Sequence, residues 1–167
     1  MASLTAPIRP EIVPLVPVKL GGVKLTTAEV FYHSGYYGID LATGRLTELT
    51  DVATKRPFGI IDLMDSDTAN AAGALALSVT GDTSASPEPK VTVDIGTKMI
   101  RDVPVTGASA ITDVGDPVYL ETDNYLADLK VAASTSLPAV GIIVGFSTST
   151  TFDVLLFSYE QMIAAGA

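Results

Sequence analysis

The sequence predicts an all-β protein: a compact barrel or sandwich of short antiparallel strands, with an extended N-terminal arm and a short C-terminal helix. Only 17% of the residues are charged, and 14 glycines and 10 prolines supply many turns, a composition that favours short strands over long amphipathic helices. A hydrophobic content of 47% in 167 residues is enough to build a core. We expect an arm over residues 1–22, a β-rich body over residues 23–157 and a helix over residues 158–167.

The first twenty residues place four prolines among isoleucine, valine and leucine. Proline fixes φ and removes an amide donor, so we expect an extended segment that is neither a helix nor a central strand. Its apolar side chains need a partner, which favours an arm lying on a neighbouring subunit or a larger surface over a loosely packed terminus. The expected contact residues are Ile8, Pro10, Ile12, Val13, Pro14, Leu15, Val16, Pro17 and Val18.

The body reads as short strands separated by turn residues. The strands expected in its first two thirds are 28–33, 36–41, 46–49, 57–61, 74–80, 90–95 and 98–105. Ser34-Gly35 predicts a turn that makes a hairpin of the first two, and Gly96-Thr97 predicts another that pairs the last two.

The stretch from Asp113 to Phe146 is the most patterned part of the chain, and it reads as strand, turn, strand, loop and strand. A weaker copy lies upstream. Residues 38–49 have the same strand, turn and strand, and residues 57–61 match residues 138–143 at an offset of roughly 80 residues. Two related β-units are therefore expected to build the body.

The C-terminal residues have the signature of a helix start. Ser158 and Gln161 are spaced as a capping box, and Phe157 and Met162 are spaced as a hydrophobic staple. Gly166 follows as a stop. A helix of about two turns needs docking to be stable, so we expect it to plug one end of the β-body or to lie in a subunit contact.

Composition excludes several classes of function. The net charge of −9, from 19 acidic and 10 basic residues, argues against binding nucleic acid through its phosphates. The absence of cysteine excludes disulfides and thiolate metal sites. The N-terminal prolines interrupt any signal-peptide core, and no segment approaches the ~18 apolar residues of a membrane helix. We therefore expect a protein made in the cytoplasm, with no membrane partner.

Candidates for catalysis are few. His33 is the single histidine and the only ordinary candidate for a base near neutral pH; a catalytic set could in principle use it with Ser34 or another serine and a distant aspartate. No nucleophile-elbow or phosphate-binding loop pattern accompanies them. We expect no enzyme activity and no cofactor.

Two acidic loops offer oxygen ligands. Asp62, Asp65, Asp67 and Asn70 share one loop, but they lack the glycine and distal glutamate of a calcium-binding helix–loop–helix motif, so a solvated turn is preferred and calcium stays the alternative. The second set, Asp113, Asp116 and Asp123, has the same two interpretations, with turn formation preferred.

The patterned stretch carries a family resemblance. Asp113-Val114-Gly115-Asp116-Pro117-Val118-Tyr119-Leu120, the Thr122-Asp123-Asn124 turn, Leu126 and the later Val140-Gly141-Ile142-Ile143 run resemble the capsid decoration, or cement, proteins of tailed bacteriophages. Residues 37–49 and 58–61 resemble the earlier half of the same pattern. The likeness covers roughly residues 28–157 and includes no catalytic signature.

The resemblance implies a small, barrel-like and often trimeric protein on the outside of a phage head. Such a protein binds at local symmetry axes and clamps neighbouring major capsid protein subunits. The implied partners are the major capsid protein and two further copies of the chain, with the protein made in the host cytoplasm and located on the virion surface. An N-terminal segment commonly contributes to the capsid contact in this family, a role onto which only the Ile8 to Leu20 arm maps.

A second interpretation is another β-rich virion surface component, such as a fibre base or a carbohydrate-binding module. Sugar-binding modules normally offer exposed aromatic platforms. The chain has no tryptophan, and its tyrosines fall at expected strand positions. The capsid interpretation is therefore preferred.

Overall fold

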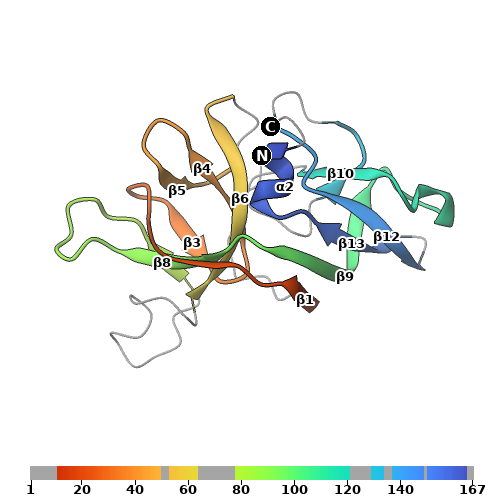
Figure 1. Cartoon of the computed structure of the whole chain (residues 1–167), viewed down its shortest axis with the longest axis horizontal. Helices are drawn as coiled ribbons and strands as arrows, with labels where there is room; N and C mark the ends of the chain where they lie inside the picture. The colour runs from red at the N-terminus through yellow and green to blue at the C-terminus, as the bar shows by residue number, and fades with distance from the viewer. Residues whose placement is uncertain are drawn as a thin grey trace.

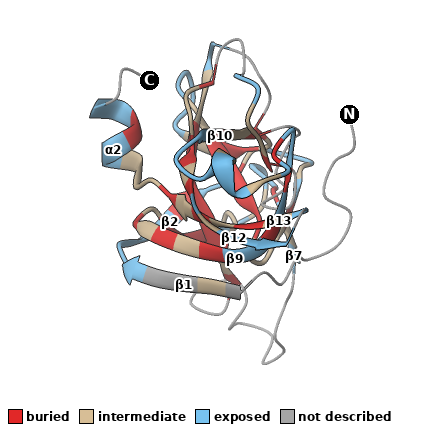
Figure 2. Ribbon diagram, turned by 90° about the vertical axis from the view of Figure 1, so that its right-hand side faces the viewer, coloured by how far each residue is buried: buried red, intermediate tan, exposed pale blue. Residues whose placement is uncertain are grey.

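The computed structural model describes residues 11–49, 53–63, 78–120, 129–133, 137–148 and 150–164. The all-β prediction is confirmed: short strands build two small barrels that lie side by side, with one short helix, α2, between them in the view of Figure 1. In Figure 2 the buried residues gather inside the barrels, and β1 lies along the outer edge of β9.

The N-terminal barrel is a five-stranded sheet whose ends meet. Its strands are β2 (Lys19–Lys24), β4 (Tyr36–Asp40), β5 (Arg45–Thr47), β6 (Lys55–Asp62) and β8 (Lys90–Asp94), in the order β2-β8-β6-β4-β5. A parallel bridge between Leu25 and Leu46 joins the two ends. The fully buried side chains of Phe31, Leu46 and Val93 lie in its core.

The C-terminal barrel closes in the same manner. It consists of β9 (Thr97–Thr106), β10 (Pro117–Leu120), β11 (Leu129–Lys130), β12 (Gly141–Thr148) and β13 (Thr151–Leu156), in the order β9-β11-β10-β12-β13 with β13 pairing back onto β9. A short 3-10 turn, η2 (Ile111–Asp113), precedes β10. The N-terminal strand β1 (Glu11–Val16) is added to the edge of β9.

The two barrels have the same topology, residue by residue. The parallel contact between Leu25 and Leu46 recurs about 80 residues later as the contact between Val105 and Leu129. Other pairs recur between equivalent strands: Tyr36–Ile60 as Pro117–Ile142, Leu20–Val93 as Ile100–Val154, and Val23–Val91 as Val103–Phe152. Strands β2, β4, β5 and β6 thus repeat about 80 residues later, which is the offset seen in the sequence, whereas β8 repeats as β13 about 60 residues later.

Local backbone geometry repeats as well. Ser34 and Gly115 both have positive φ, of 63° and 107°. The Ser34 amide donates to the Ile61 carbonyl and the Gly115 amide donates to the Ile143 carbonyl, at 3.0 and 2.9 Å. Both sites are turns that lead into the second strand of a barrel, where the left-handed conformation favours glycine. The first barrel holds a serine in this conformation.

The two hairpins expected from local turn signals are wrong. β3 (Val30–Tyr32) pairs with β7 (Ser78–Thr80), not with β4. β8 and β9 do not pair with each other; they follow one another through Ile95 and Gly96 and cross from the first barrel to the second. Both errors have one cause, since a glycine between two strands permits a change of direction but does not require one.

A continuous antiparallel ribbon links the barrels. β1 and β2 together pair with β9 and β8 together, from Glu11 opposite Arg101 to Lys24 opposite Lys90. The two crossing segments run together along the lower side of both barrels in Figure 1. Residues 11–20 are therefore extended, as expected, and they lie in this ribbon as an edge strand and the first part of β2; Gly22 has a positive φ of 74° where the register of β2 shifts.

The helix α2 (Tyr159–Ala164) begins as the sequence predicts. The Gln161 amide donates to the Ser158 hydroxyl at 3.2 Å, and the Ser158 amide donates to Gln161 Oε1 at 2.7 Å, which is the reciprocal pattern of a capping box. Met162 is buried, and the Tyr159 ring packs against both cores. The helix therefore plugs the junction between the barrels; Gly166 lies outside the described residues.

Alkaline solution is expected to destabilise the fold through its buried tyrosines. Burial raises the pKa of Tyr36 far above the ordinary tyrosine value, and burial is also the main cause of the raised pKa of Tyr37. Because the folded state holds these protons more tightly, their contribution to stability is complete below the unfolded-state pKa of about 10 and is lost as pH rises above it.

We expect the free energy of unfolding, measured by urea denaturation, to fall above about pH 10, and to fall less steeply in Tyr36→Phe. The lysines are common to both proteins, so the difference isolates Tyr36. At neutral pH the variant loses only a 3.6 Å contact between the hydroxyl and Met162 Sδ, a small cost. Identical slopes in both proteins would contradict the prediction.

Candidate functional site

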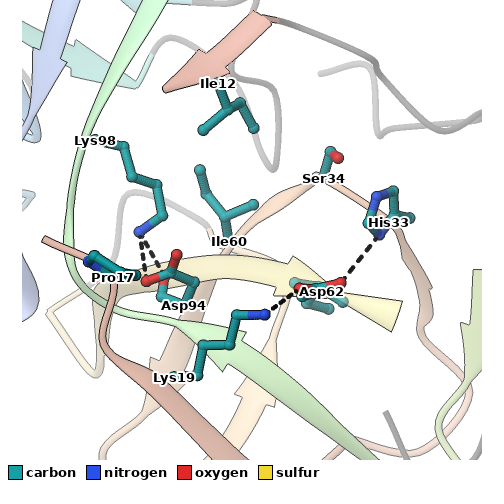
Figure 3. Close-up of a pocket in the computed structure, with 10 residues that line it drawn as sticks. Ile12, Pro17, Lys19, His33, Ser34, Ile60, Asp62, Asp94 and Lys98 are labelled. Atoms are coloured by element: carbon teal, nitrogen blue, oxygen red, sulfur yellow. Dashed lines mark hydrogen bonds and ion pairs between the residues drawn. The ribbon is translucent and has the colours of Figure 1, made fainter. Parts of the chain in front are cut away.

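A concave feature lies where the ribbon passes between the barrels. A cavity of about 370 Å³ is lined by apolar and charged side chains: Ile12, Pro17, Lys19, His33, Ser34, Ile60, Ile61, Asp62, Asp94 and Lys98. Figure 3 shows Lys98 and Asp94 on one side and His33 and Asp62 on the other, with Ile12 and Ile60 between them. His33, the single histidine, and Ser34 thus lie at the barrel junction.

The Lys98 ammonium group is buried and has three acceptors. It donates to Asp94 Oδ1 and to the Asp94 carbonyl at 3.0 Å, and to the Gly96 carbonyl at 2.7 Å. Burial lowers the pKa of Lys98, and the Asp94 carboxylate opposes this shift. An ammonium group has three N–H donors. The contacts therefore match its full donor capacity and fix the lysine as part of the structure.

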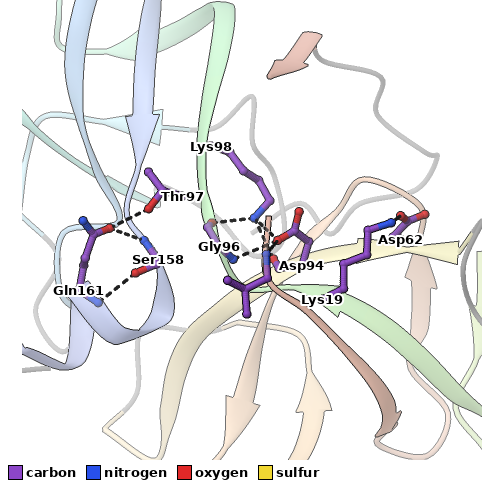
Figure 4. Close-up of polar contacts among 9 residues, drawn as sticks. Lys19, Asp62, Asp94, Gly96, Thr97, Lys98, Ser158 and Gln161 are labelled. Atoms are coloured by element: carbon purple, nitrogen blue, oxygen red, sulfur yellow. Dashed lines mark hydrogen bonds and ion pairs between the residues drawn. The ribbon is translucent and has the colours of Figure 1, made fainter. Parts of the chain in front are cut away.

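Asp94 Oδ1 also holds the ribbon. It accepts the amide of Val18 at 3.2 Å. It also accepts the amide of Gly96 at 3.0 Å, as Figure 4 shows. One carboxylate oxygen thus joins the β1–β2 connection, the β8–β9 connection and the buried lysine. We refer to the buried ion pair of Asp94 and Lys98 as the clasp, because it joins these segments at the junction.

On the other side of the cavity His33 is held by the backbone. Its Nδ1 accepts the amide of Leu63 at 3.2 Å, which places the proton of the neutral ring on Nε2. Nδ1 also lies 4.0 Å from Asp62 Oδ1, and Asp62 Oδ2 accepts from Lys19 Nζ at 3.0 Å. Ser34 forms the turn already described. His33 thus directly follows β3, and Ser34 lies in the turn after it.

The residues considered as calcium ligands divide into those outside the described residues and those within them, which are Asp62, Asp113 and Asp116. Asp65, Asp67, Asn70 and Asp123 lie outside the described residues. Asp62 is engaged with Lys19, and Asp113 accepts the amides of Ser109 and Ala110 at 2.7 and 2.9 Å, bonds that lower its pKa. Within the described ranges no cluster of three or more metal-ligating side chains occurs. Asp113 is thus accounted for as a turn former.

The predicted contact residues of the arm are only partly described. Ile12 is half-buried against the C-terminal core, and Val13 and Pro14 belong to β1. Ile8 and Pro10 lie outside the described residues. Leu15, Val16 and Val18 have exposed fractions of 49%, 59% and 45%, and Pro17 between them is also exposed.

Leu20 extends this exposed set, with an exposed fraction of 44%. We refer to Leu15, Val16, Val18 and Leu20 as the apolar strip. Part of the strip borders a groove of about 270 Å³ between the ribbon and α2, which Val16, Val18, Gly96 and Gln161 help to line. The strip is the one element of the predicted arm with large apolar side chains facing solvent in the part of the chain that the structure describes.

Sequence reasoning missed two features of this region. Leu20 was assigned to the arm but not to its contact set, although the alternation of apolar residues continues to it. The clasp of Asp94 and Lys98 had no sequence signal that sets it apart, because polar residues at such positions also occur on the solvent side of ordinary strands.

The comparisons with known proteins do not add to this description. A scan against protein-family models and searches of curated proteins and of solved structures found no match. Among the described residues, no helix has both the length and the apolar character needed to cross a membrane.

Proposed function

We propose that this protein is a structural virion component that binds the outside of a phage capsid and stabilises the shell by clamping neighbouring major capsid protein subunits. The observation that carries the proposal is the apolar strip. Four large apolar side chains are exposed within six residues of one ribbon, in a chain with a net charge of −9. Large apolar side chains exposed close together on one segment are typical of a contact with another macromolecule.

The fold supports a clamp in a second way. Two barrels of one topology are held side by side by the ribbon, by α2 and by a core that they share, since Tyr36 and Ile60 of the first barrel pack into the core of the second. A rigid body with two similar halves is suited to contact two neighbouring copies of one capsid subunit. Repeated over a shell, modest contacts of this kind add up to tight overall attachment.

A carbohydrate-binding role has less support. Tyr36 and Tyr37 are buried, and Tyr32, Tyr119 and Tyr159 are half-buried. These tyrosines therefore offer no exposed platform for stacking on a sugar ring, and tryptophan is absent from the sequence. The outer capsid surface as location, and the homotrimer that the family resemblance implies, are parts of the proposal that the capsid experiment addresses.

The test uses capsids of the source phage prepared without this protein. Purified chain is added, and bound protein is scored by co-sedimentation, by electron microscopy and by the temperature at which the shells break. We expect bound protein at each local threefold axis and a higher breakage temperature. Capsids that neither retain the chain nor gain heat resistance would overturn the proposal.

The contact itself is tested with the double variant Leu15→Glu, Val16→Glu. Each aliphatic side chain buried in a contact contributes about 1.5–3 kcal/mol, so losing both is expected to weaken capsid binding at least about a hundredfold. Ile111→Glu is the matched control, because Ile111 is 68% exposed and lies in η2, away from the strip. Equal binding by all three proteins would contradict a role for the strip.

A further inference from the structure

The two barrels differ at one strand edge, where the first strand approaches the third; we refer to this edge as the seam. Each closes through a parallel contact between its first and third strands, at Leu25 and Leu46 in one and at Val105 and Leu129 in the other. On the N-terminal side of Val105, the same edge of β9 is covered by β1, which places Ile12 opposite Ile100. β2 is the counterpart of β9, and among the described strands none lies on this edge of β2.

The exposure of equivalent residues shows what this difference does. Ile100 is 0% exposed, whereas its counterpart Leu20 is 44% exposed. On the other edge of each strand, Ile100 pairs with Val154 and Leu20 pairs with Val93, and both valines are fully buried. Side chains of directly paired residues lie on the same face of a sheet. Leu20 therefore lies on the face of β2 that is directed toward the barrel interior. Its strand edge is uncovered among the described residues, whereas β1 covers the equivalent edge of β9.

The residue before Leu20 on the same face shows the same contrast. Val18 is 45% exposed, and its counterpart Lys98 is 3% exposed. An apolar segment in extended conformation, lying antiparallel to β2, would cover both side chains as β1 covers this position on β9. By analogy with Ile12 opposite Ile100, we expect a strand bound at this edge to place a branched aliphatic residue opposite Leu20.

The chain contains a second segment that resembles the part of β1 lying opposite Ile100. Ile12-Val13-Pro14 supplies the residues opposite Ile100, Met99 and Lys98. Four residues earlier, Ile8-Arg9-Pro10 repeats the pattern of isoleucine, any residue and proline. If this segment lay on β2 in the register that β1 has on β9, Ile8 would lie opposite Leu20.

This segment cannot reach the open seam of its own chain. Ile8-Arg9-Pro10 is joined directly to Glu11, which pairs with Arg101 at the outer end of the ribbon. Leu20 lies nine residues further along the same ribbon, a distance of roughly 30 Å at the rise of a β-strand. The segment can meet a Leu20 side chain only on another molecule.

We propose that residues 8–10 of one copy of this chain bind antiparallel along Val18 and the first residues of β2, 19–21, in a second copy, with Ile8 packed over Leu20. Each copy then donates a segment to one neighbour and accepts a segment from another. Such head-to-tail contacts close into a ring when the rotation between copies permits, a geometry compatible with a trimer. The contact is between copies of this chain and is tested without capsids; it would cover Val18 and Leu20 and leave Leu15 and Val16 of the apolar strip for the proposed capsid contact.

The test exploits the absence of cysteine from the sequence. Two single variants, Ile8→Cys and Leu20→Cys, are mixed without capsids and oxidised. We expect a disulfide-linked heterodimer, since directly opposed residues lie within the reach of a disulfide. Ile8→Cys mixed with Leu41→Cys is the control, because Leu41 is on the same barrel, is 54% exposed and is not at the seam. Cross-linking that is no greater at Leu20 than at Leu41 overturns the proposal.

Sedimentation measures the same contact without cross-links. We expect the wild-type chain to associate, and Leu20→Glu and Ile8→Glu each to raise the dissociation constant at least tenfold. Because one variant keeps a working segment and the other keeps a working edge, their mixture should form one-to-one pairs. A monomeric wild-type chain, or a mixture that stays monomeric, overturns the proposal, and circular dichroism verifies that each variant is folded.

Discussion

Replacement of Lys98 by methionine is expected to lower the free energy of unfolding by about 3–5 kcal/mol, because it leaves a buried carboxylate without its counter-charge. Asp94 is 8% exposed, and its Oδ1 lies 3.0 Å from Lys98 Nζ. The substitution also removes the donor from the carbonyls of Asp94 and Gly96. Urea denaturation at neutral pH measures the loss.

Lys19→Met is the matched control on the same ribbon. Lys19 Nζ also lies 3.0 Å from a carboxylate, that of Asp62, but its side chain is 45% exposed. Exposed pairs contribute up to about 1 kcal/mol, so we expect a small loss. Equal losses in the two variants would show that the burial of the clasp has no energetic consequence.

A double-mutant cycle then separates the charge pair from the rest of the site. Asp94→Asn keeps an oxygen that accepts the amides of Val18 and Gly96 but leaves Lys98 charged and buried. Combining it with Lys98→Met removes both charges together. We expect the double variant to lose clearly less stability than the sum of the two single losses, since neither charge is then left alone.

The parts of the fold that were predictable from sequence depend on local rules. The capping box of Ser158 and Gln161 occurs as predicted, because both of its hydrogen bonds join residues three apart. The repeat was visible because each unit needs the same alternation of buried and exposed residues to build the same barrel. Composition was enough for the all-β class.

The parts that were missed depend on contacts between distant segments. The ribbon pairs Lys19 with Asp94 and Glu11 with Arg101, across about 75 to 90 residues of chain. No local pattern identifies such partners, and a nearby turn signal favours the wrong pairing. The same limit applies to the seam of β2. Leu20 and Ile100 look alike in sequence, and only the position of β1 makes one exposed and the other buried.

Gly96 was expected in a hairpin turn, and its role in the structure is instead close packing. A Cβ atom at this position would lie 1.9 Å from the Val16 carbonyl oxygen and 2.8 Å from the Val18 amide nitrogen. Both are backbone atoms, which cannot move aside as a flexible side chain would. The glycine therefore permits the two crossing segments to approach each other where they pass between the barrels.

Gly96→Ala is accordingly expected to destabilise the protein by about 3 kcal/mol or more, at the upper end of the range for overpacking, because the ribbon itself has to separate. Gly21→Ala is the control on the neighbouring strand, since a Cβ there would meet only Thr92 Oγ1, at 3.8 Å. Urea denaturation measures both variants. The separation also displaces the amides of Val18 and Gly96 from Asp94, so part of the loss should disappear when Gly96→Ala is made in the Lys98→Met background. Strict additivity would mean that the glycine and the clasp act independently.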